Sequence, residues 1–235
     1  MFNGFPPAGI RFLKEFERNN TTAWFRANKG RYDETVRAPM VELVEAVNSS
    51  LTDFAPAYLA RLPGGLSRPN RDTRFSKDKT PYRTDIAVVF PRNGREKHQA
   101  AGFFLRVSPA GAEVLGGVYL PGPAELRALR AWLARDHAEF STLITNPGLR
   151  RCMGTLQGKC LQRVPRDFAP DHPAAALLRH TQLYFQTILP VSVVTTPALV
   201  PEAIRRFKAM TPFVTALDRA LAPLHARRGG PGGRS

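Results

Sequence analysis

The residues best suited to chemistry lie in one stretch near the middle of the chain. Between Arg68 and Arg83 the sequence holds six cationic side chains and only two acidic ones, Asp72 and Asp78. Guanidinium forks, ammonium groups and hydroxyls are together the groups that bind phosphate oxygens. We therefore expect an anion-binding site in this stretch. Its predicted ligand-binding residues are Arg71, Arg74, Ser76, Lys77, Lys79, Tyr82 and Arg83.

A structural interpretation of the same stretch stays open. Asp72 and Asp78 can pair with the neighbouring cations, while Phe75 and Tyr82 hold an irregular loop against the core. The anion-site interpretation requires the cationic groups to point into one shared hollow. A nucleotide-binding phosphate loop is not expected, because the stretch has no Gly-x-x-x-x-Gly-Lys-Ser/Thr pattern.

Candidates for catalysis are few. Asp72 and Asp78 are candidate general bases, and His172 is the third, although an Asp-x-Pro sequence such as Asp171-His172-Pro173 more often caps the following helix. The sequence has no histidine pair at metal-ligand spacing, and Cys152 and Cys160 match no zinc spacing. We expect no metal and no cofactor. Whether the protein is an enzyme, and whether the two cysteines pair, stays open.

Aromatic residues outside the basic stretch allow two interpretations. Trp24, Tyr32 and Tyr119 are candidate rings for a groove in which bases stack, but such rings also form ordinary cores. The pair Gly116-Gly117 either lets a ligand approach the backbone or marks a bulge or strand end.

The composition of the whole chain favours anionic partners. The 34 Lys and Arg residues outnumber the 19 Asp and Glu residues and give a formal net charge of +15. Such a field attracts nucleic acid above all, although an arginine-rich composition also arises from a GC-rich genome. No apolar run approaches the ~20 residues that cross a bilayer, and residues 1–16 lack a secretion-signal pattern. We expect a soluble, cytoplasmic protein with no membrane span.

The elements that position the basic stretch follow from periodicity and turn chemistry. Ile10, Leu13 and Phe16 predict a first helix over about 5–19, and a second apolar stripe predicts helix from Thr22 to Leu51, kinked or restarted at Pro39. Residues 63–82 lose the helical period. Strands are predicted at 85–90, 102–108, 113–119 and 188–194, and later helices at about 123–133, 174–184 and 201–224.

This order of elements predicts an α+β fold. We expect an antiparallel sheet of about four to five strands in the middle of the chain, with helices from both ends packed against it. One domain is predicted over residues 1–226, followed by a disordered Gly/Arg-rich tail over 227–235.

A family resemblance rests on the basic stretch. Residues 71–84 read Arg-Asp-Thr-Arg-Phe-Ser-Lys-Asp-Lys-Thr-Pro-Tyr-Arg-Thr, which resembles the signature of the uncharacterised domain-of-unknown-function twenty-four-sixty-one family. Trp24-Phe25, Asn28-Lys29 and Pro165-Arg166 agree with it. The resemblance implies one soluble domain, but no activity, cofactor or catalytic residue. Asn70 stands where the family usually has an apolar or aromatic residue.

Two functional hypotheses follow. The first is binding of a phosphate-bearing partner, nucleic acid or a nucleotide-like metabolite, through Arg71–Arg83, with catalysis left open. The alternative is a non-enzymatic interaction or scaffold domain that presents the same segment to an acidic protein as a rigid surface hairpin. The oligomeric state is left open.

Overall fold

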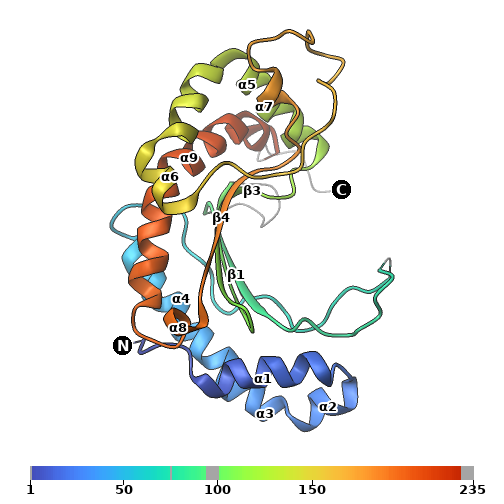
Figure 1. Ribbon diagram of the computed structural model, residues 1–235, viewed down its shortest axis with the longest axis vertical. Coiled ribbons are helices and arrows are strands. Elements are labelled where there is room, and N and C mark those ends of the chain that lie inside the picture. Colours follow the sequence, from blue (N-terminus) through green and yellow to red (C-terminus); the bar gives the residue numbers. More distant parts are fainter. Residues whose placement is uncertain (1, 75, 94–100, 229–235) are drawn as a thin grey trace. The chain divides into compact units, whose positions relative to one another are not determined.

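The computed structural model describes residues 2–74, 76–93 and 101–228, and it confirms the α+β prediction. One antiparallel sheet of four strands, in the order β1-β2-β3-β4, is preceded and followed by helices along the chain (Figure 1). The strands are β1 (Ile86–Pro91), β2 (Gly102–Ser108), β3 (Gly111–Val118) and β4 (Leu183–Leu189). The predicted meander of the first three strands is confirmed.

The chain divides into two compact units. Unit 1 comprises Met1–Phe90, Phe104–Val114 and Thr187–Arg205, and unit 2 comprises Pro91–Phe103, Leu115–Gln186 and Arg206–Ser235. The prediction of one domain over 1–226 stays a prediction. The predicted tail lies outside the described residues from 229 onward, whereas Arg227 and Arg228 belong to the last helix.

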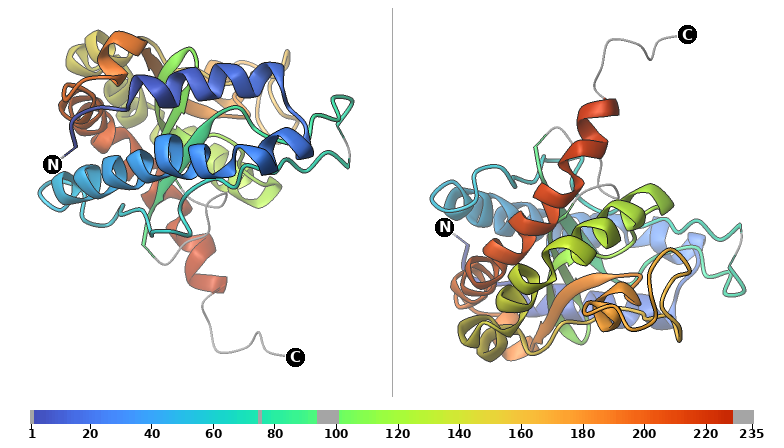
Figure 2. Two further views of the ribbon diagram at one scale, coloured as in Figure 1. Left: turned by 90° about the horizontal axis from the view of Figure 1, so that it is seen from below. Right: turned by 90° about the horizontal axis from the view of Figure 1, so that it is seen from above.

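Unit 1 begins with helices that the sequence encodes locally. Helix α1 (Pro7–Arg18) starts at a proline in its first turn and buries Ile10, Leu13 and Phe16, as predicted. Helix α2 (Thr22–Ala27) is capped by Thr21, whose hydroxyl accepts the Trp24 amide at 3.3 Å. Helices α3 (Lys29–Tyr32) and α4 (Ala38–Leu51) follow. Figure 2 shows α1 and α4 from two further sides.

The helix predicted to kink or restart at Pro39 is interrupted just before this residue by a π-helical segment, η1 (Asp33–Arg37), between α3 and α4. Proline has no N–H, so Pro39 cannot donate to the Thr35 carbonyl four residues earlier, and the helix widens there. The Ala38 amide donates to the Asp33 carbonyl, five residues back. The Thr35 carbonyl oxygen faces Gly9 of α1 so closely that a Cβ at Gly9 would overlap it.

Unit 2 contains the helices α5 (Pro123–Thr145), α6 (Pro147–Met153), α7 (Ala175–Leu178) and the later part of α9 (Leu199–Arg228), which continues through Pro212 and Pro223. Large rings lie on α5 and α9. Phe213 of α9 contacts Phe140 of α5 and Phe185 of β4, with ring centroids 5.8 and 5.0 Å apart. These contacts form the centre of the unit 2 core.

The fourth strand was predicted in the wrong place. Residues Val191–Val194 form the single-turn helix α8, and the strand lies earlier, at Leu183–Leu189. Pro190 explains the difference, because it cannot donate to a strand ladder and its backbone conformation caps the α8 turn. The predicted helix over 174–184 is correspondingly reduced to α7.

The pair Gly116-Gly117 serves packing. A Cβ at Gly117, whose φ is +136°, would overlap the Leu183 carbonyl oxygen of β4, and a Cβ at Gly116 would lie 2.7 Å from the Met210 sulfur. Both glycines therefore let neighbouring elements approach the β3 backbone.

Replacing Gly9 tests the contact between α1 and the π-helical segment. We expect Gly9→Ala to lower the free energy of unfolding by about 1–3 kcal/mol, because the added methyl group overlaps the Thr35 carbonyl. Gly30→Ala is the matched control, since a Cβ there has no neighbour within 4 Å; alanine should raise the stability by about 0.4–1 kcal/mol. Urea-unfolding midpoints measure both. Equal stabilisation by the two substitutions would show that α1 does not pack on Thr35 in this way.

Candidate functional site: the basic arm

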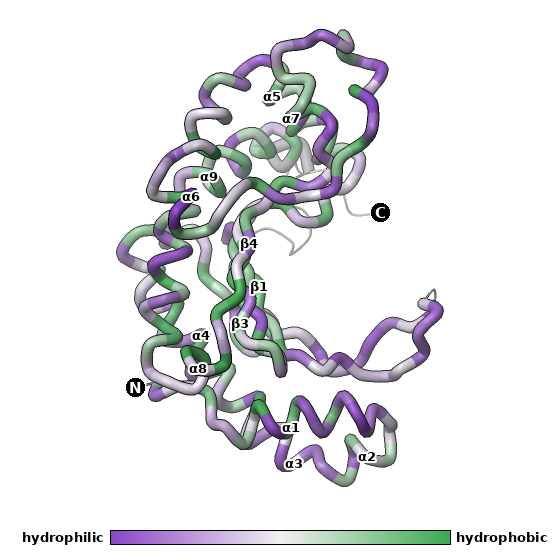
Figure 3. Tube along the Cα trace, in the orientation of Figure 1, coloured by the Kyte–Doolittle hydropathy of each residue, from purple (hydrophilic) through white to green (hydrophobic). Residues whose placement is uncertain are grey.

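The basic stretch projects from the start of β1 as two paired segments, which we call the basic arm (residues 68–74 and 76–83, with Phe75 outside the described residues); an isolated antiparallel bridge joins Asn70 and Tyr82. At its root the Ser67 amide donates to the Ala87 carbonyl of β1 at 2.7 Å. Further out the Arg71 amide donates to Pro81 O at 2.8 Å and the Arg83 amide to Pro69 O at 2.7 Å. The arm is therefore an antiparallel ribbon that continues β1 outward. It is hydrophilic along most of its length (Figure 3).

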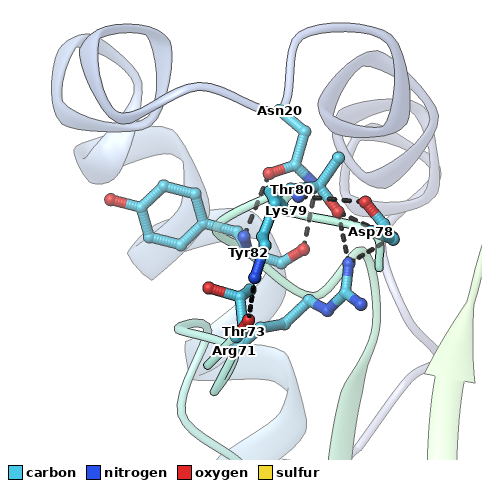
Figure 4. A network of polar contacts seen from close by, with 7 residues as sticks. All are labelled: Asn20, Arg71, Thr73, Asp78, Lys79, Thr80 and Tyr82. Atoms are coloured by element: carbon cyan, nitrogen blue, oxygen red, sulfur yellow. Dashed lines mark hydrogen bonds and ion pairs between the residues drawn. The ribbon is translucent and has the colours of Figure 1, made fainter. Parts of the chain in front are cut away.

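One amide side chain fixes the arm to the helices of unit 1. The Asn20 Nδ2 group donates to the Tyr82 carbonyl at 2.9 Å, and the Tyr82 amide donates to Asn20 Oδ1 at 3.0 Å (Figure 4). The Tyr82 ring is buried against Phe16 and Phe25, with centroid distances of 5.6 and 4.5 Å. Backbone pairing and ring packing thus hold the same residue, so the arm leaves the core in a defined direction.

Within the arm, the Asp78 carboxylate accepts three hydrogen bonds. Its Oδ1 accepts the Thr80 amide at 2.9 Å, and its Oδ2 accepts the Thr80 hydroxyl at 3.0 Å and the Arg71 guanidinium at 2.6 Å. Arg71 also donates to the Thr80 hydroxyl. Lys79 crosses the ribbon and donates to the Thr73 carbonyl at 2.9 Å (Figure 4). These bonds brace the two sides of the arm against each other.

Nearer the tip, Arg74 holds Asp72 with both prongs of its guanidinium, at 3.0 and 2.7 Å. The Arg74 side chain is 78% exposed. Lys77 and Arg68 are also exposed, and neither forms an ion pair with any described residue. The Ser76 amide closes a turn by donating to Thr73 O at 3.2 Å.

A second set of charges lies at the base of the arm, and it was not foreseen from the sequence. Arg83 contacts Asp85 at 3.0 Å, Asp85 contacts Arg106 of β2 at 3.6 Å, and Arg106 pairs with Glu113 of β3. A signal for the last pair exists, since a β2–β3 hairpin with Pro109-Ala110 at its turn places 106 opposite 113. The resulting row of alternating charges connects the arm base to β2 and β3.

The acidic residues of the arm are strongly ionised. The hydrogen bond from the Thr80 amide, and then those from Arg71 and the Thr80 hydroxyl, lower the pKa of Asp78 to about 2. The Arg74 guanidinium and amide likewise lower the pKa of Asp72. A carboxylate held by its donors in this way is a weak general base, so the arrangement offers counter-charges for the arginines rather than proton transfer.

The third catalytic candidate lies elsewhere. His172 belongs to unit 2, and its Nδ1 accepts the Ala174 amide at 3.0 Å at the start of α7, so this nitrogen already has a partner. The His137 ring of α5 contacts it edge-on, with centroids 6.2 Å apart. His172 therefore closes a local turn before α7, whose N-cap residue is Ala174 with no side-chain cap.

Two of the three candidate stacking rings belong to the aromatic core of unit 1, and the third belongs to unit 2. Tyr32 is 4% exposed and Trp24 is half-buried, and both contact Phe12 in the aromatic core of unit 1. Burial, followed by the nearby charge of Asp33, raises the pKa of Tyr32 to about 12. Tyr119 lies in unit 2, is 50% exposed and contacts Tyr184 at a centroid distance of 5.1 Å.

Across the described residues, no three His, Cys, Asp or Glu side chains gather in a way that could hold a metal ion. Cys152 and Cys160 are both free thiols. Among the helices of residues 2–74, 76–93 and 101–228, none is long and apolar enough to span a membrane.

Comparison with known proteins identifies one family. The family model described as "Conserved hypothetical protein (DUF2461)" matches residues 8–215, a range that includes the basic arm. No curated protein and no solved structure matches the chain.

Removing the Asn20 side chain tests the attachment of the arm. We expect Asn20→Ala to lower the free energy of unfolding by about 1–3 kcal/mol, because it leaves the part-buried amide of Tyr82 without its acceptor. Asn19→Ala is the neighbouring control, since that amide makes only an exposed bond to Glu15 O and its loss should cost about 0.5 kcal/mol or less. Urea denaturation compares the two. Identical losses would mean that Asn20 does not anchor the arm.

The low pKa of Asp78 predicts how the arm responds to acid. Because the folded pKa, about 2, is below the ordinary 3.8, the contribution of Asp78 is complete above pH ~4 and is lost as pH falls toward 2. NMR titration of the Asp78 carboxyl carbon and of the Thr80 amide should follow this loss. In Arg71→Gln the pKa should rise but stay below 3.8, because the Thr80 donors remain. An Asp78 pKa near 3.8 in the native protein would contradict this arrangement.

Proposed function

We propose that the chain, which belongs to the DUF2461 family of conserved hypothetical proteins, binds nucleic acid through its phosphates, using the basic arm. The observation that carries the proposal is the exposed, braced ribbon that holds six cations against two acids and projects from β1. A cytoplasmic location, where nucleic acid is accessible, is part of the proposal.

The distribution of charge supports an extended ligand. Arg68, Arg74, Lys77 and Lys79 are exposed along the arm. The arginines at 71, 74 and 83 pair with separate acids, and Arg68 and Lys77 form no ion pair with a described residue. The described cations therefore do not meet the condition stated for an anion site, that they point into one shared hollow. A nucleotide-like metabolite needs several donors that converge on one phosphate. A chain of phosphates can contact each cation separately, so polymeric nucleic acid fits the arm better than a small phosphorylated ligand.

The internal ion pairs do not prevent such binding. Both partners of the Arg74–Asp72 pair are mostly exposed, at 78% and 59% of their side chains. Pairs of this kind contribute about 0–1 kcal/mol, so a phosphate can displace the carboxylate. Until then Asp72 holds the guanidinium in an extended, outward position.

A rigid hairpin that meets an acidic protein is the second candidate. It is favoured by the bracing of the arm through Asp78 and by its attachment through Asn20, which fix a shape rather than only a charge. The two candidates differ in salt dependence, because counterion release makes nucleic-acid binding fall steeply with ionic strength, whereas a protein interface with an apolar centre falls less. Neither candidate includes catalysis.

The test replaces two exposed cations of the arm. We expect Arg74→Ala/Lys77→Ala to weaken binding to a fluorescent oligonucleotide at least tenfold at 0.1 M salt and to reduce the salt slope by roughly 1–2. The melting temperature should stay nearly unchanged, because both side chains are exposed.

Arg150→Ala/Arg151→Ala is the control with the same change in net charge, on the exposed face of α6 in unit 2. It should weaken binding about twofold or less. Equal losses in the two double variants would reduce the arm to a part of the overall charge, and no oligonucleotide binding at moderate salt would favour the acidic-protein candidate.

A further inference from the structure

The two acids of the basic arm differ in what they hold. Among the described residues, the hydrogen bonds to Asp72 come from Arg74 alone, from its guanidinium at 3.0 and 2.7 Å and from its amide at 3.2 Å. Asp78 accepts instead from the Thr80 amide, the Thr80 hydroxyl and the Arg71 guanidinium, at 2.9, 3.0 and 2.6 Å. Asp72 therefore serves one neighbour, whereas Asp78 joins two residues to each other.

The contact between Asp72 and the Arg74 guanidinium can open without moving the backbone. The Arg74 side chain is 78% exposed and that of Asp72 is 59% exposed, and ion pairs between side chains this exposed are weak. When the guanidinium leaves, Asp72 still accepts the Arg74 amide, so the local turn stays closed. The long arginine side chain is thus the part that rotates toward a ligand, while the carboxylate stays in place.

The contact between Asp78 and Arg71 holds the arm together. Arg71 lies in the first segment of the arm, and it reaches across to Asp78 and to the Thr80 hydroxyl in the second (Figure 4). Its side chain is only 28% exposed. Lys79 makes a similar crossing to the Thr73 carbonyl at 2.9 Å. Withdrawing Arg71 toward a ligand would therefore separate the two segments.

The ionisation of the two acids follows the same division. The Arg74 guanidinium, and then the Arg74 amide, lower the pKa of Asp72. The pKa of Asp78 is lowered to about 2 by the Thr80 amide first and by Arg71 second. The charge of Asp72 is thus stabilised mainly by a side chain that can leave, and that of Asp78 mainly by a backbone donor.

We propose that the two acids act oppositely on ligand binding: Asp72 is an internal competitor that occupies the Arg74 guanidinium until a nucleic-acid phosphate takes its place, and Asp78 is a brace that keeps Arg71 across the ribbon. This inference rests on the proposed function and adds the regulation of the same site. Its consequence is that two substitutions with the same change in net charge alter the affinity in opposite directions.

The first experiment compares Asp72→Asn with Asp78→Asn on a fluorescent oligonucleotide at 0.1 M salt. Asparagine at 72 still accepts the Arg74 amide but releases the guanidinium, so binding should become about three- to fivefold tighter. Asparagine at 78 turns an amide donor or a neutral oxygen toward Arg71, so the brace weakens and binding should become about twofold weaker or more, despite the added charge.

Asp53→Asn is the control for charge alone, because Asp53 is exposed just after α4 and lies outside the arm. It should change the affinity by about 1.5-fold or less. Equal tightening in all three variants would mean that only net charge matters and would overturn the proposal. Weaker binding of Asp72→Asn would overturn the role of Asp72 as a competitor, and tightening by Asp78→Asn would overturn its role as a brace.

A double-mutant cycle ties the effect to one contact. In an Arg74→Ala background, Asp72→Asn should change the affinity by about 1.5-fold or less, because the guanidinium that it releases is gone. A gain as large as in the native background would show that Asp72 acts through the overall charge and would overturn the proposal.

NMR of the full chain follows the exchange directly. On addition of the oligonucleotide, the Arg74 Nε signal and the Asp72 carboxyl signal should shift, whereas those of Arg71 and Asp78 should stay close to their positions in the free chain. The reverse pattern, or unchanged signals of Arg74 and Asp72 in the complex, would overturn the exchange.

The two proposals fail differently. If Arg74→Ala/Lys77→Ala weakens binding while Asp72→Asn and Asp78→Asn act alike, the opposite roles of the acids alone are rejected. If no oligonucleotide binds, or if Arg74→Ala/Lys77→Ala binds as the native chain does, the proposed function is rejected with them. Circular dichroism of each variant confirms that the helices are retained.

Discussion

The pairing of the Asn20 side chain with the Tyr82 backbone is the constraint on which the arrangement of unit 1 depends. It joins two segments that lie 62 residues apart in the chain through two hydrogen bonds. The Asn20 amide nitrogen donates to the Tyr82 carbonyl, and the Asn20 amide oxygen accepts the Tyr82 N–H. Tyr82 is also the residue whose ring enters the aromatic core. Because the same residue is fixed at its backbone and at its side chain, the arm cannot rotate about its root without exposing apolar rings and breaking both hydrogen bonds.

Charge, rather than apolar packing, sets the conformation of the arm beyond this root. Asp78 accepts hydrogen bonds from Arg71 and Thr80, and Asp72 accepts them from Arg74. On the sheet, ion pairs join Asp85 to Arg106 and Arg106 to Glu113. Single exposed ion pairs contribute little to stability, but Asp72 also accepts the Arg74 amide and Asp78 also accepts the Thr80 hydroxyl, and these bonds close local turns. Stability of the fold comes from the two cores, and the arm uses its charges for shape.

The sequence predicted those parts of the fold that local chemistry determines. Pro7 with the Ile10, Leu13 and Phe16 stripe placed α1, turn residues placed β1 to β3, and cation density located the arm. Prediction failed where distant partners decide. Ile188–Val194 has the composition of a strand, yet Pro190 and the pairing of residues 183–189 with β3 placed the strand earlier. In the same way, no spacing rule links Asn20 to Tyr82 or Asp85 to Arg106, because these contacts arise only after the sheet and helices have assembled.

The bidentate contact between Arg74 and Asp72 also determines which anions can compete for the Arg74 guanidinium. An arginine in bulk solution is accompanied by mobile anions, whose number depends on the buffer. Arg74 instead pairs with the carboxylate of Asp72, two residues away in the same chain. The effective concentration of this carboxylate near the guanidinium exceeds that of dilute chloride or acetate. Small monovalent ions are therefore poor competitors for the Arg74 guanidinium, and under the proposed function a nucleic acid has to displace the Asp72 carboxylate before it contacts this arginine.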